Sequence, residues 1–486
     1  MTMLGPWRRR AVWLALGLVL SLIHEPFGAW PLTFGVFAIV FFWDDASSDV
    51  KTGFGQGWWF GFGYFAGTFQ WIVHPFFVQP EVYGWLAPFG ILALSGGAGV
   101  FWGIAFAAAR LLSPRYINWP PAIILSLVLI EALRGIILSG FPWGMLAQAF
   151  VETGFGQALS IIGPHGLGLV VLLIAAVPFM VPRALGLALA FATFGMIEIW
   201  GQLRLSQPTA LRDYTVRILQ TNNQQDRKWD PNWRSIYFEE NLALNRTPGR
   251  FDISIWPENA VTWAMNDIPL RRHDIRMAAG DKPALVGGHH YRGRDYFNTL
   301  AFIGQDGLVR HYYDKHHLVP FGEYIPLTPL IEQLGYGEYL RTYWTRGAPP
   351  EPVALEGVPT YLPLICYETI FPRYSFASPR PDWIVQVTND AWFGNFSGPQ
   401  QHLAQSRMRA IEQGLPIARA ANTGISAIID GRGRVLAHIP MNERGVLDHP
   451  LPEAEDATIY SKIGSLPAWG MLLLLAGLAY RARHQP

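Results

Sequence analysis

The chain contains a single cysteine among its 486 residues, so it forms no intramolecular disulfide. Cys366 directly follows an apolar run, 361–365. Polar residues come after it, including Glu368 two positions further on. Such a run predicts a strand whose end presents the thiol at the edge of a sheet. Most free cysteines are buried as small apolar residues. A thiol at a strand end can instead act as a nucleophile, provided that a base or a cation offsets its ordinary pKa of about 8.5.

Two other segments supply a candidate base and a candidate cation. Glu258 follows the apolar run 253–256, and Pro257 stops that run, which places the carboxylate in a loop. Lys315 lies in 312–324, a segment dense in histidine and aromatic residues. A surface carboxylate and a solvated lysine are the ordinary alternatives. If these segments meet at neighbouring strand ends, Glu258 and Lys315 could activate Cys366 for nucleophilic catalysis.

Other cofactor and ligand chemistries find little support in the sequence. His316 and His317 are adjacent, but no cysteine or regularly spaced third ligand accompanies them, so we expect no metal. The sequence has neither a Walker-type phosphate loop nor a G-x-G-x-x-G motif, so we expect no nucleotide cofactor. The formal net charge of +1 gives no support to nucleic-acid binding.

Charge is distributed unevenly along the chain. Only 15% of the residues are charged, against about 25% in typical soluble domains, and 17 of them lie in 1–205 while 56 lie in 206–486. This composition excludes a disordered, collagen-like or coiled-coil protein and also a plain soluble enzyme. Apolar stretches near the length that crosses a membrane lie at 10–24, 30–43, 54–73, 84–111, 120–138, 160–180, 184–200 and 466–479.

These stretches predict a membrane domain of about seven helices in 1–205 and a C-terminal transmembrane helix with a cytoplasmic tail in 463–486. Positive residues of short loops stay in the cytoplasm. If the chain crosses the membrane eight times, the positive residues of its short loops and ends fall on one side of the membrane. They are Arg8, Arg9, Arg10, Lys51, Arg110, Arg115, Arg183, Arg481 and Arg483. Both chain ends are therefore predicted to be cytoplasmic, with the segment between the seventh and eighth spans in the periplasm. Glu131 and Arg134 should form an ion pair, with contact to a phospholipid head group as the alternative.

Residues 212–455 have the pattern of a soluble α/β domain. Apolar, β-branched runs alternate with helix-like stretches, of which 400–413 is the clearest. Hairpin turns are indicated at 305–307 and 430–433. The alternation favours a sheet covered by helices and packed against a second sheet.

The three candidate segments resemble the Glu-Lys-Cys triad of the nitrilase superfamily, in order and in spacing. They read W-P-E-N-A around Glu258, D-K-H-H-L-V-P-F-G-E-Y around Lys315 and L-I-C-Y-E around Cys366. Further motifs resemble one membrane-embedded branch, the apolipoprotein N-acyltransferase family. They are Glu131-Ala-Leu-Arg-Gly, Ser139-Gly-Phe-Pro-Trp, Lys228-Trp-Asp-Pro, Thr388-Asn-Asp-Ala-Trp-Phe-Gly and Arg419-Ala-Ala-Asn-Thr-Gly-Ile-Ser. The resemblance covers nearly the whole chain.

This resemblance implies about eight transmembrane helices joined to a periplasmic nitrilase-like αββα sandwich in the bacterial inner membrane. It implies that Glu258 deprotonates Cys366, which attacks a phospholipid ester, with phosphatidylethanolamine as the expected donor. Lys315 and a backbone N–H near Tyr367 would stabilise the oxyanion. The resulting thioester would then acylate the α-amino group of the S-diacylglyceryl cysteine of an apolipoprotein. We expect no cofactor and a monomer.

The resemblance also implies supporting residues. Glu323 is expected to orient Lys315, and Tyr367 and Glu368 to shape the site, with ordinary packing as the alternative for Tyr367. The expected substrate-binding residues are Trp229, Asn389, Trp392 and Phe393, for which core or loop packing is the alternative.

Two other functions stay open at this point. A membrane-anchored nitrilase-type amidase would use water as its second nucleophile and hydrolyse a C–N bond. A transporter or assembly scaffold would carry an inactive nitrilase-like domain, but charge within the apolar stretches is sparse for a transporter.

Overall fold

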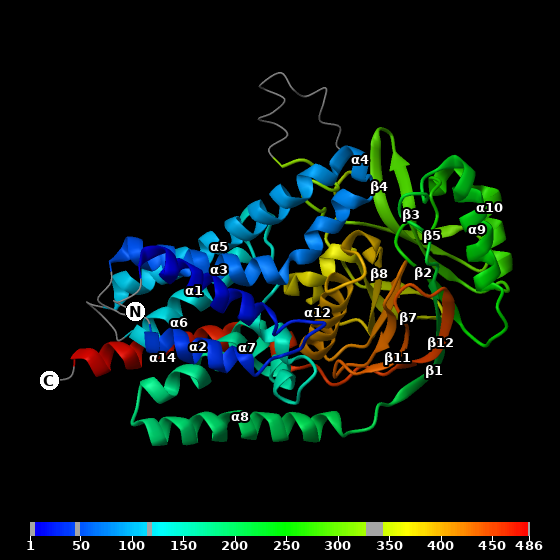
Figure 1. Cartoon of the computed structure of the whole chain (residues 1–486). Helices are drawn as coiled ribbons and strands as arrows, with labels where there is room; N and C mark the ends of the chain where they lie inside the picture. Colours follow the sequence, from blue (N-terminus) through cyan, green and yellow to red (C-terminus); the bar gives the residue numbers. More distant parts are fainter. Residues whose placement is uncertain (1–4, 44–48, 114–118, 327–343, 485–486) are drawn as a thin grey trace. The chain divides into compact units, whose positions relative to one another are not determined.

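The computed structural model describes residues 5–43, 49–113, 119–326 and 344–484 (Figure 1). Arg115, one of the residues used to predict the orientation, lies outside them. Contacts within the chain define two compact units. The helical unit comprises Met1–Pro208, Phe396–Gly414 and Asp456–Pro486, and the α/β unit comprises Thr209–Asn395 and Leu415–Glu455.

A helix lies at each of the eight apolar stretches. These helices are α1 (Pro6–Ser21), α2 (Leu32–Trp43), α3 (Val50–Thr68), α5 (Ala87–Leu112), α6 (Trp119–Arg134), α7 (Leu159–Ala176), α8 (Arg183–Leu205) and α14 (Leu466–His484). Within the described ranges, three helical stretches are long and apolar enough to cross a membrane: Pro80–Leu112, Phe155–Phe179 and Arg183–Leu205. The apolar helices at Leu32–Phe42 and Leu466–Ala482 are shorter. The eight-span topology stays a prediction.

Shorter elements complete the helical unit. They are α4 (Pro80–Tyr83), α12 (Gly398–Gln413), α13 (Ile459–Ile463) and the 3-10 turns η1 (Gln70–Phe77), η2 (Gly84–Leu86), η3 (Ile137–Ser139), η4 (Leu146–Phe150), η5 (Phe155–Ala158) and η6 (Val177–Phe179). Helix α12 confirms the helix predicted at 400–413, although its sequence lies between two strands of the α/β unit.

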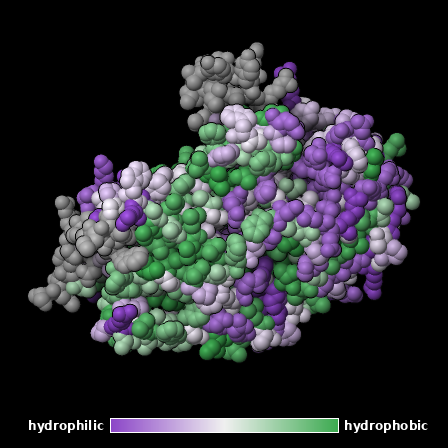
Figure 2. Space-filling view, in the orientation of Figure 1, coloured by the Kyte–Doolittle hydropathy of each residue, from purple (hydrophilic) through white to green (hydrophobic). Residues whose placement is uncertain are grey.

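Glycines allow the backbones of the long helices to approach closely. A Cβ atom on Gly57 of α3 would lie 2.4 Å from the carbonyl oxygen of Trp102 in α5. On another part of α3, a Cβ atom on Gly63 would lie 2.2 Å from the carbonyl oxygen of Leu14 in α1. Small residues at helix contacts are typical of helix packing in membranes. Figure 2 shows hydrophobic side chains gathered over the outside of the helical unit.

The charged residues expected near the end of the fifth span form an ion pair. Arg134 donates to Glu131 at 2.6 Å, and its side chain is only 3% exposed. Trp102 donates to the same carboxylate at 2.8 Å. The guanidinium also binds the carbonyl oxygens of Phe141 and Trp143. These contacts satisfy both charges inside the helical unit, as the predicted ion pair requires.

The α/β unit contains two six-stranded sheets. The first has the order β12-β1-β2-β3-β4-β5, with β1 (Leu211–Gln220), β2 (Ile253–Trp256), β3 (Ala284–Arg292), β4 (Asp295–Ile303), β5 (Val309–Asp314) and β12 (Gly445–Pro452). The second has the order β11-β10-β9-β8-β7-β6, with β6 (Val353–Leu355), β7 (Val358–Ile365), β8 (Trp383–Thr388), β9 (Ile417–Ala421), β10 (Ser426–Ile429) and β11 (Val435–Ile439). The antiparallel pairs β4–β5 and β10–β11 confirm the two predicted hairpins.

Alternate residues of each strand face different layers, as the period of a strand requires. In β1, Val216 and Ile218 lie in a core that also includes Val385 and Val387 of β8, so the two sheets pack face to face. Leu219 lies in a second core with residues of α9 (Pro231–Asn245) and α10 (Pro269–Ala278). These helices therefore cover the outer face of the first sheet.

Strand direction determines where the candidate residues meet. Strands β1, β2 and β3 are parallel, and β5 runs the same way because β4 is antiparallel to both neighbours. In the second sheet β7, β8 and β9 are parallel. Glu258 and Lys315 therefore follow carboxyl ends in the first sheet, and Cys366 and Asn389 follow carboxyl ends in the second.

Candidate active site

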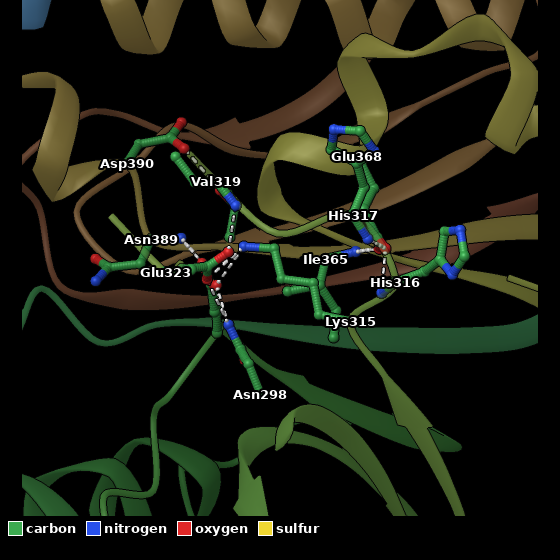
Figure 3. Close-up of polar contacts among 12 residues, drawn as sticks. Asn298, Lys315, His316, His317, Val319, Glu323, Ile365, Glu368, Asn389 and Asp390 are labelled. Atoms are coloured by element: carbon green, nitrogen blue, oxygen red, sulfur yellow. Dashed lines mark hydrogen bonds and ion pairs between the residues drawn. The ribbon is translucent and has the colours of Figure 1, made fainter. Parts of the chain in front are cut away.

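The carboxylate of Glu258 lies in a loop after β2 and has three donors, from Asn298, Lys315 and Asn389, which are labelled in Figure 3. Asn298 of β4 donates from Nδ2 to Oε1 at 2.7 Å, and Lys315 lies 3.4 Å from the same oxygen. The backbone N–H of Asn389, at the end of β8, donates to Oε2 at 2.9 Å. Glu258 is only 5% exposed. These donors bring both sheets together around one buried carboxylate.

Lys315 lies between two carboxylates. Its Nζ donates to Oε1 of Glu323 at 2.8 Å in addition to its contact with Glu258. Oε2 of Glu323 accepts the N–H of Val319 at 2.8 Å, which fixes that carboxylate within its own loop. Burial lowers the pKa of Lys315, but the two carboxylates raise it more, so its pKa lies above the ordinary value. Lys315 is therefore a permanent ammonium group.

Cys366 is the first residue after β7 and has a φ of 52°, in the left-handed region that non-glycine residues rarely adopt. The backbone thus turns sharply where the strand ends, and Cys366 remains only 5% exposed. Burial raises the pKa of its thiol, and the charge of Glu258 raises it further, against the opposing effect of Lys315. The resting thiol is therefore protonated and needs a base at the moment of reaction.

Glu368 connects the turn at Cys366 with the segment after β5. Its Oε1 accepts the hydroxyl of Tyr313 at 2.8 Å and the backbone N–H groups of His316 at 2.8 Å and His317 at 3.0 Å. Its Oε2 accepts the N–H of Ile365 at 2.7 Å. The residue is fully buried, and burial raises the pKa of the carboxyl above its usual range. One side chain therefore fixes the positions of both the nucleophile turn and the Lys315 segment.

The remaining predicted residues differ in their surroundings. Tyr367 is buried and its ring lies 5.5 Å from that of His317. The side chain of Asn389 accepts from Asn422 and donates to Gln225. Trp229, 45% exposed, and Trp392, 39% exposed, present large apolar surfaces. Phe393 packs against the core between the sheets. Asn389, Trp392 and Phe393 lie at one turn after β8, η11 (Asp390–Phe393), whereas Trp229 lies in the segment between β1 and α9.

Sequence reasoning missed two residues of this site. Asn298 bridges the carboxylates, since its Nδ2 lies 2.7 Å from Glu258 and 3.2 Å from Glu323. Lys228 is 1% exposed and donates from Nζ to the backbone carbonyl of Glu258 at 3.0 Å. A signal for Asn298 was present, because it is a polar residue within the otherwise apolar run of β4. Lys228 lies in the motif Lys228-Trp-Asp-Pro, but the spacing of that motif gives no indication of this contact.

Two of the motifs that supported the family resemblance meet in the second sheet. Asp390, in the motif after β8, forms a fully buried ion pair with Arg419 of β9. Asn422, three residues after Arg419, donates to Asn389 at 2.9 Å. The charge of Asp390 also raises the pKa of the Cys366 thiol. These motifs therefore support the strand end beside the nucleophile.

The adjacent histidines have other partners than a metal. Nδ1 of His316 lies 2.8 Å from the carbonyl oxygen of Gly347, and Nδ1 of His317 lies 2.8 Å from the hydroxyl of Tyr374. Burial, with nearby cations, lowers the pKa of His317 to about 3, so it is neutral. Across the described ranges of the chain, no group of three or more His, Cys, Asp or Glu residues has a metal-binding arrangement.

A buried thiol, a carboxylate and a permanent ammonium group together suit nucleophilic attack on a carbonyl carbon. Family models match both parts of the chain. A model described as carbon-nitrogen hydrolase matches residues 247–459, which places the site in a domain of the nitrilase class. A model described as the apolipoprotein N-acyltransferase N-terminal domain matches residues 16–177.

Relatives match over nearly the full length. An apolipoprotein N-acyltransferase from Rhodopseudomonas palustris is 36% identical, covering 99% of this chain and 96% of the relative. One from Caulobacter vibrioides is 33% identical, covering 98% and 95%. The chain therefore belongs to the apolipoprotein N-acyltransferase family. A solved CN-hydrolase superfamily protein from Xanthomonas campestris, with an arsenic adduct in its active site, has a TM-score of 0.36 and 20% identity, covering 56% of this chain and 96% of that chain.

Proposed function

We propose that this protein transfers an acyl chain from a phospholipid to the N-terminal S-diacylglyceryl cysteine of apolipoproteins, through a thioester on Cys366. The observation that carries the proposal is the buried cluster in which Lys315 contacts Glu258 and Glu323 beside the turn at Cys366, on a chain that belongs to this family. Phosphatidylethanolamine is the proposed donor.

In the first half-reaction Glu258 takes the thiol proton while the sulfur of Cys366 attacks the ester carbonyl. The C–S bond forms and negative charge develops on the carbonyl oxygen. The ammonium group of Lys315, with a backbone N–H near Tyr367, stabilises that charge. The ester C–O bond then breaks, and the departing lysophospholipid oxygen takes the proton from Glu258. A neutral acyl thioester remains.

In the second half-reaction the neutral α-amino group of the apolipoprotein cysteine attacks the thioester carbonyl. The C–N bond forms and the C–S bond breaks. Glu258 accepts a proton from the amine and returns it to the departing sulfur of Cys366. The products are an N-acylated lipoprotein and the resting thiol. Glu323, Glu368 and Tyr367 hold this arrangement in place, whereas Trp229, Asn389, Trp392 and Phe393 are proposed to contact substrate.

Both substrates are lipid-anchored, which explains why the enzyme needs a membrane part. Moving an acyl chain into water would cost about 0.8 kcal/mol for each exposed CH₂ group. We propose eight transmembrane helices within 1–205 and 463–486, both chain ends in the cytoplasm, and the catalytic domain, 212–455, on the periplasmic side of the bacterial inner membrane. The alternation of Lys and Arg between loops supports this orientation. We propose that the protein acts as a monomer.

The experiment is to incubate the purified full-length protein in detergent with phosphatidylethanolamine alone. Mass spectrometry then detects any acyl group on the Cys366 peptide. The expected result is an adduct that hydroxylamine removes and that disappears when a diacylated lipopeptide is added. Cys366→Ala protein is the control and should form no adduct.

Absence of an adduct from folded protein, across several phospholipids, would overturn the proposal. Ammonia release from small amides would then favour the amidase. Complementation separates the enzyme from the scaffold: a Cys366→Ala protein that fully restores growth of a null strain would show that the thiol is not needed.

A further inference from the structure

A buried lysine that the acyl-transfer steps above do not use lies against the proposed base. Lys228 is in the segment between β1 and α9, and it is 1% exposed. Its Nζ donates to the main-chain carbonyl oxygen of Glu258 at 3.0 Å. An ammonium group is rarely buried unless a charge or several acceptors compensate for lost hydration. Its position therefore needs an explanation beyond packing.

The charges around Glu258 explain why an ammonium group is buried there. Glu258 is buried, the side chain of Glu323 is 13% exposed, and Lys315, which contacts both carboxylates, supplies only one positive charge. Two formal negative charges therefore face one positive charge. Lys228 is the cation whose burial and position beside Glu258 restore the balance. A nearby negative charge, Asp390, is already paired with Arg419.

Local backbone contacts show that the loop of Glu258 is held tightly. A Cβ atom on Gly287 of β3 would lie 2.1 Å from the carbonyl oxygen of Pro257, so only glycine fits there. Asn241 of α9 donates from Nδ2 to the carbonyl oxygen of Ala260 at 3.2 Å. Lys228 therefore adds a third contact to a loop already supported at both ends, and it alone among these three brings charge.

We propose that Lys228 is a positioning residue for Glu258: its ammonium group holds the main chain of the base and places a positive charge beside it. The proposal rests on the role assigned to Glu258 in the proposed function. Burial lowers the pKa of Lys228 to about 8, against the opposing effect of the Glu258 charge, so the ammonium form predominates at neutral pH.

The test is the pH dependence of Cys366 alkylation by iodoacetamide, measured by mass spectrometry on the full-length protein in detergent. Because Cys366 is the only cysteine, every alkylated thiol reports on this site. The assay contains no phospholipid, so it can be read even if the proposed acyl donor is wrong. Charged groups near Glu258 and the thiol include Lys315, Glu323, Glu368, Asp390 and its partner Arg419, and they stay unchanged in every variant.

In Lys228→Met protein, loss of the positive charge should move the acid limb of the alkylation profile upward by about one pH unit. The rate on that limb should fall about tenfold at a given pH. Lys228→Arg keeps the charge and should restore the native position of the limb. If Lys228→Met does not fold, as judged by thermal melting, Lys228→Gln replaces it.

Two control variants separate charge from support of the loop. Asn241→Ala removes an uncharged contact to the same loop and should reduce the rate equally at every pH, leaving the limb in place. Lys282→Met removes a lysine that also donates to a backbone carbonyl, that of Phe251, but away from the site, and should leave the profile unchanged. The proposal is overturned if Lys228→Met lowers the rate without moving the limb, or if Lys228→Arg moves it as far as Lys228→Met does.

Discussion

Replacing Glu368 with glutamine tests whether one buried carboxylate holds the nucleophile turn and the Lys315 segment in register. Glutamine has nearly the same shape, but it can present only one oxygen. If that oxygen takes the place of Oε1, it still accepts from Tyr313 and from the backbone N–H groups of His316 and His317. The amide NH₂ group then faces the N–H of Ile365, which the carboxylate accepts at 2.7 Å. Two donors therefore face each other in a buried place.

The free-energy cost of Glu368→Gln follows from the hydrogen bonds that it changes. A hydrogen bond to a charged group contributes about 1.5–3 kcal/mol, and an unsatisfied buried donor costs about 1–3 kcal/mol. Glu368→Gln should therefore cost about 3 kcal/mol. If that free energy is lost from the geometry that the transition state requires, the acylation rate falls about 100-fold, at 1.36 kcal/mol for each factor of ten. Tyr313→Phe removes one donor only and should cost about 1 kcal/mol, or about fivefold.

The assay is the rate of thioester formation on Cys366 from phosphatidylethanolamine, together with a melting temperature for each variant. The expected order is native, then Tyr313→Phe, then Glu368→Gln, in both rate and stability. Native rate and stability in Glu368→Gln protein would refute the reasoning, because four contacts to one carboxylate would then contribute nothing. A stability loss with an unchanged rate in the surviving folded protein would show that the contacts hold the fold without positioning the nucleophile.

Three further outcomes are expected. Burial holds the pKa of the Cys366 thiol above its ordinary value. In Glu258→Gln protein, alkylation of this thiol should therefore be slower than alkylation of free glutathione at pH 8, and its rate should still rise beyond pH 9. A rate that reaches a plateau below pH 8 would contradict this expectation. Asn298→Ala removes contacts to two carboxylates and should slow acylation at least tenfold; an unchanged rate would mean that the other donors suffice. Gly57→Ala should destabilise the helical unit by about 1–3 kcal/mol, measured by melting, whereas Gly55→Ala, which has open space around it, should not.

Much of the site was predictable because it lies where apolar runs end. Cys366 and Glu258 each follow a strand, and parallel strands bring such ends to one edge of a sheet. The family resemblance supplied the identity of the partners. Asn298 was harder to predict, since its function depends on the pairing of β4 with β5, the strand that precedes Lys315, and pairing partners are not visible in a single sequence.

The sequence also did not show to which of the two compact units helix α12 belongs. The stretch 400–413 has a clear helical pattern, and the structure contains α12 there. Its neighbours in sequence are β8 and β9, which suggested that the helix belongs to the α/β domain. Its side chains bind residues of the helical unit instead: Gln401 accepts from Trp143 at 2.7 Å and Arg409 pairs with Glu412 within the helix. Periodicity predicts a helix but not the surface against which it packs.

The charge states of the site explain how a buried thiol can serve the proposed acyl transfer. A permanently ionised thiolate would be costly inside the sandwich, and the raised pKa of Cys366 shows that burial favours the neutral form. Lys315 shows the opposite behaviour, because two carboxylates keep it charged despite burial. Negative charge therefore develops only when a carbonyl group binds beside the ammonium group and Glu258 takes the thiol proton. Once the thioester forms and the leaving group takes the proton from Glu258, the charges return to those of the resting site.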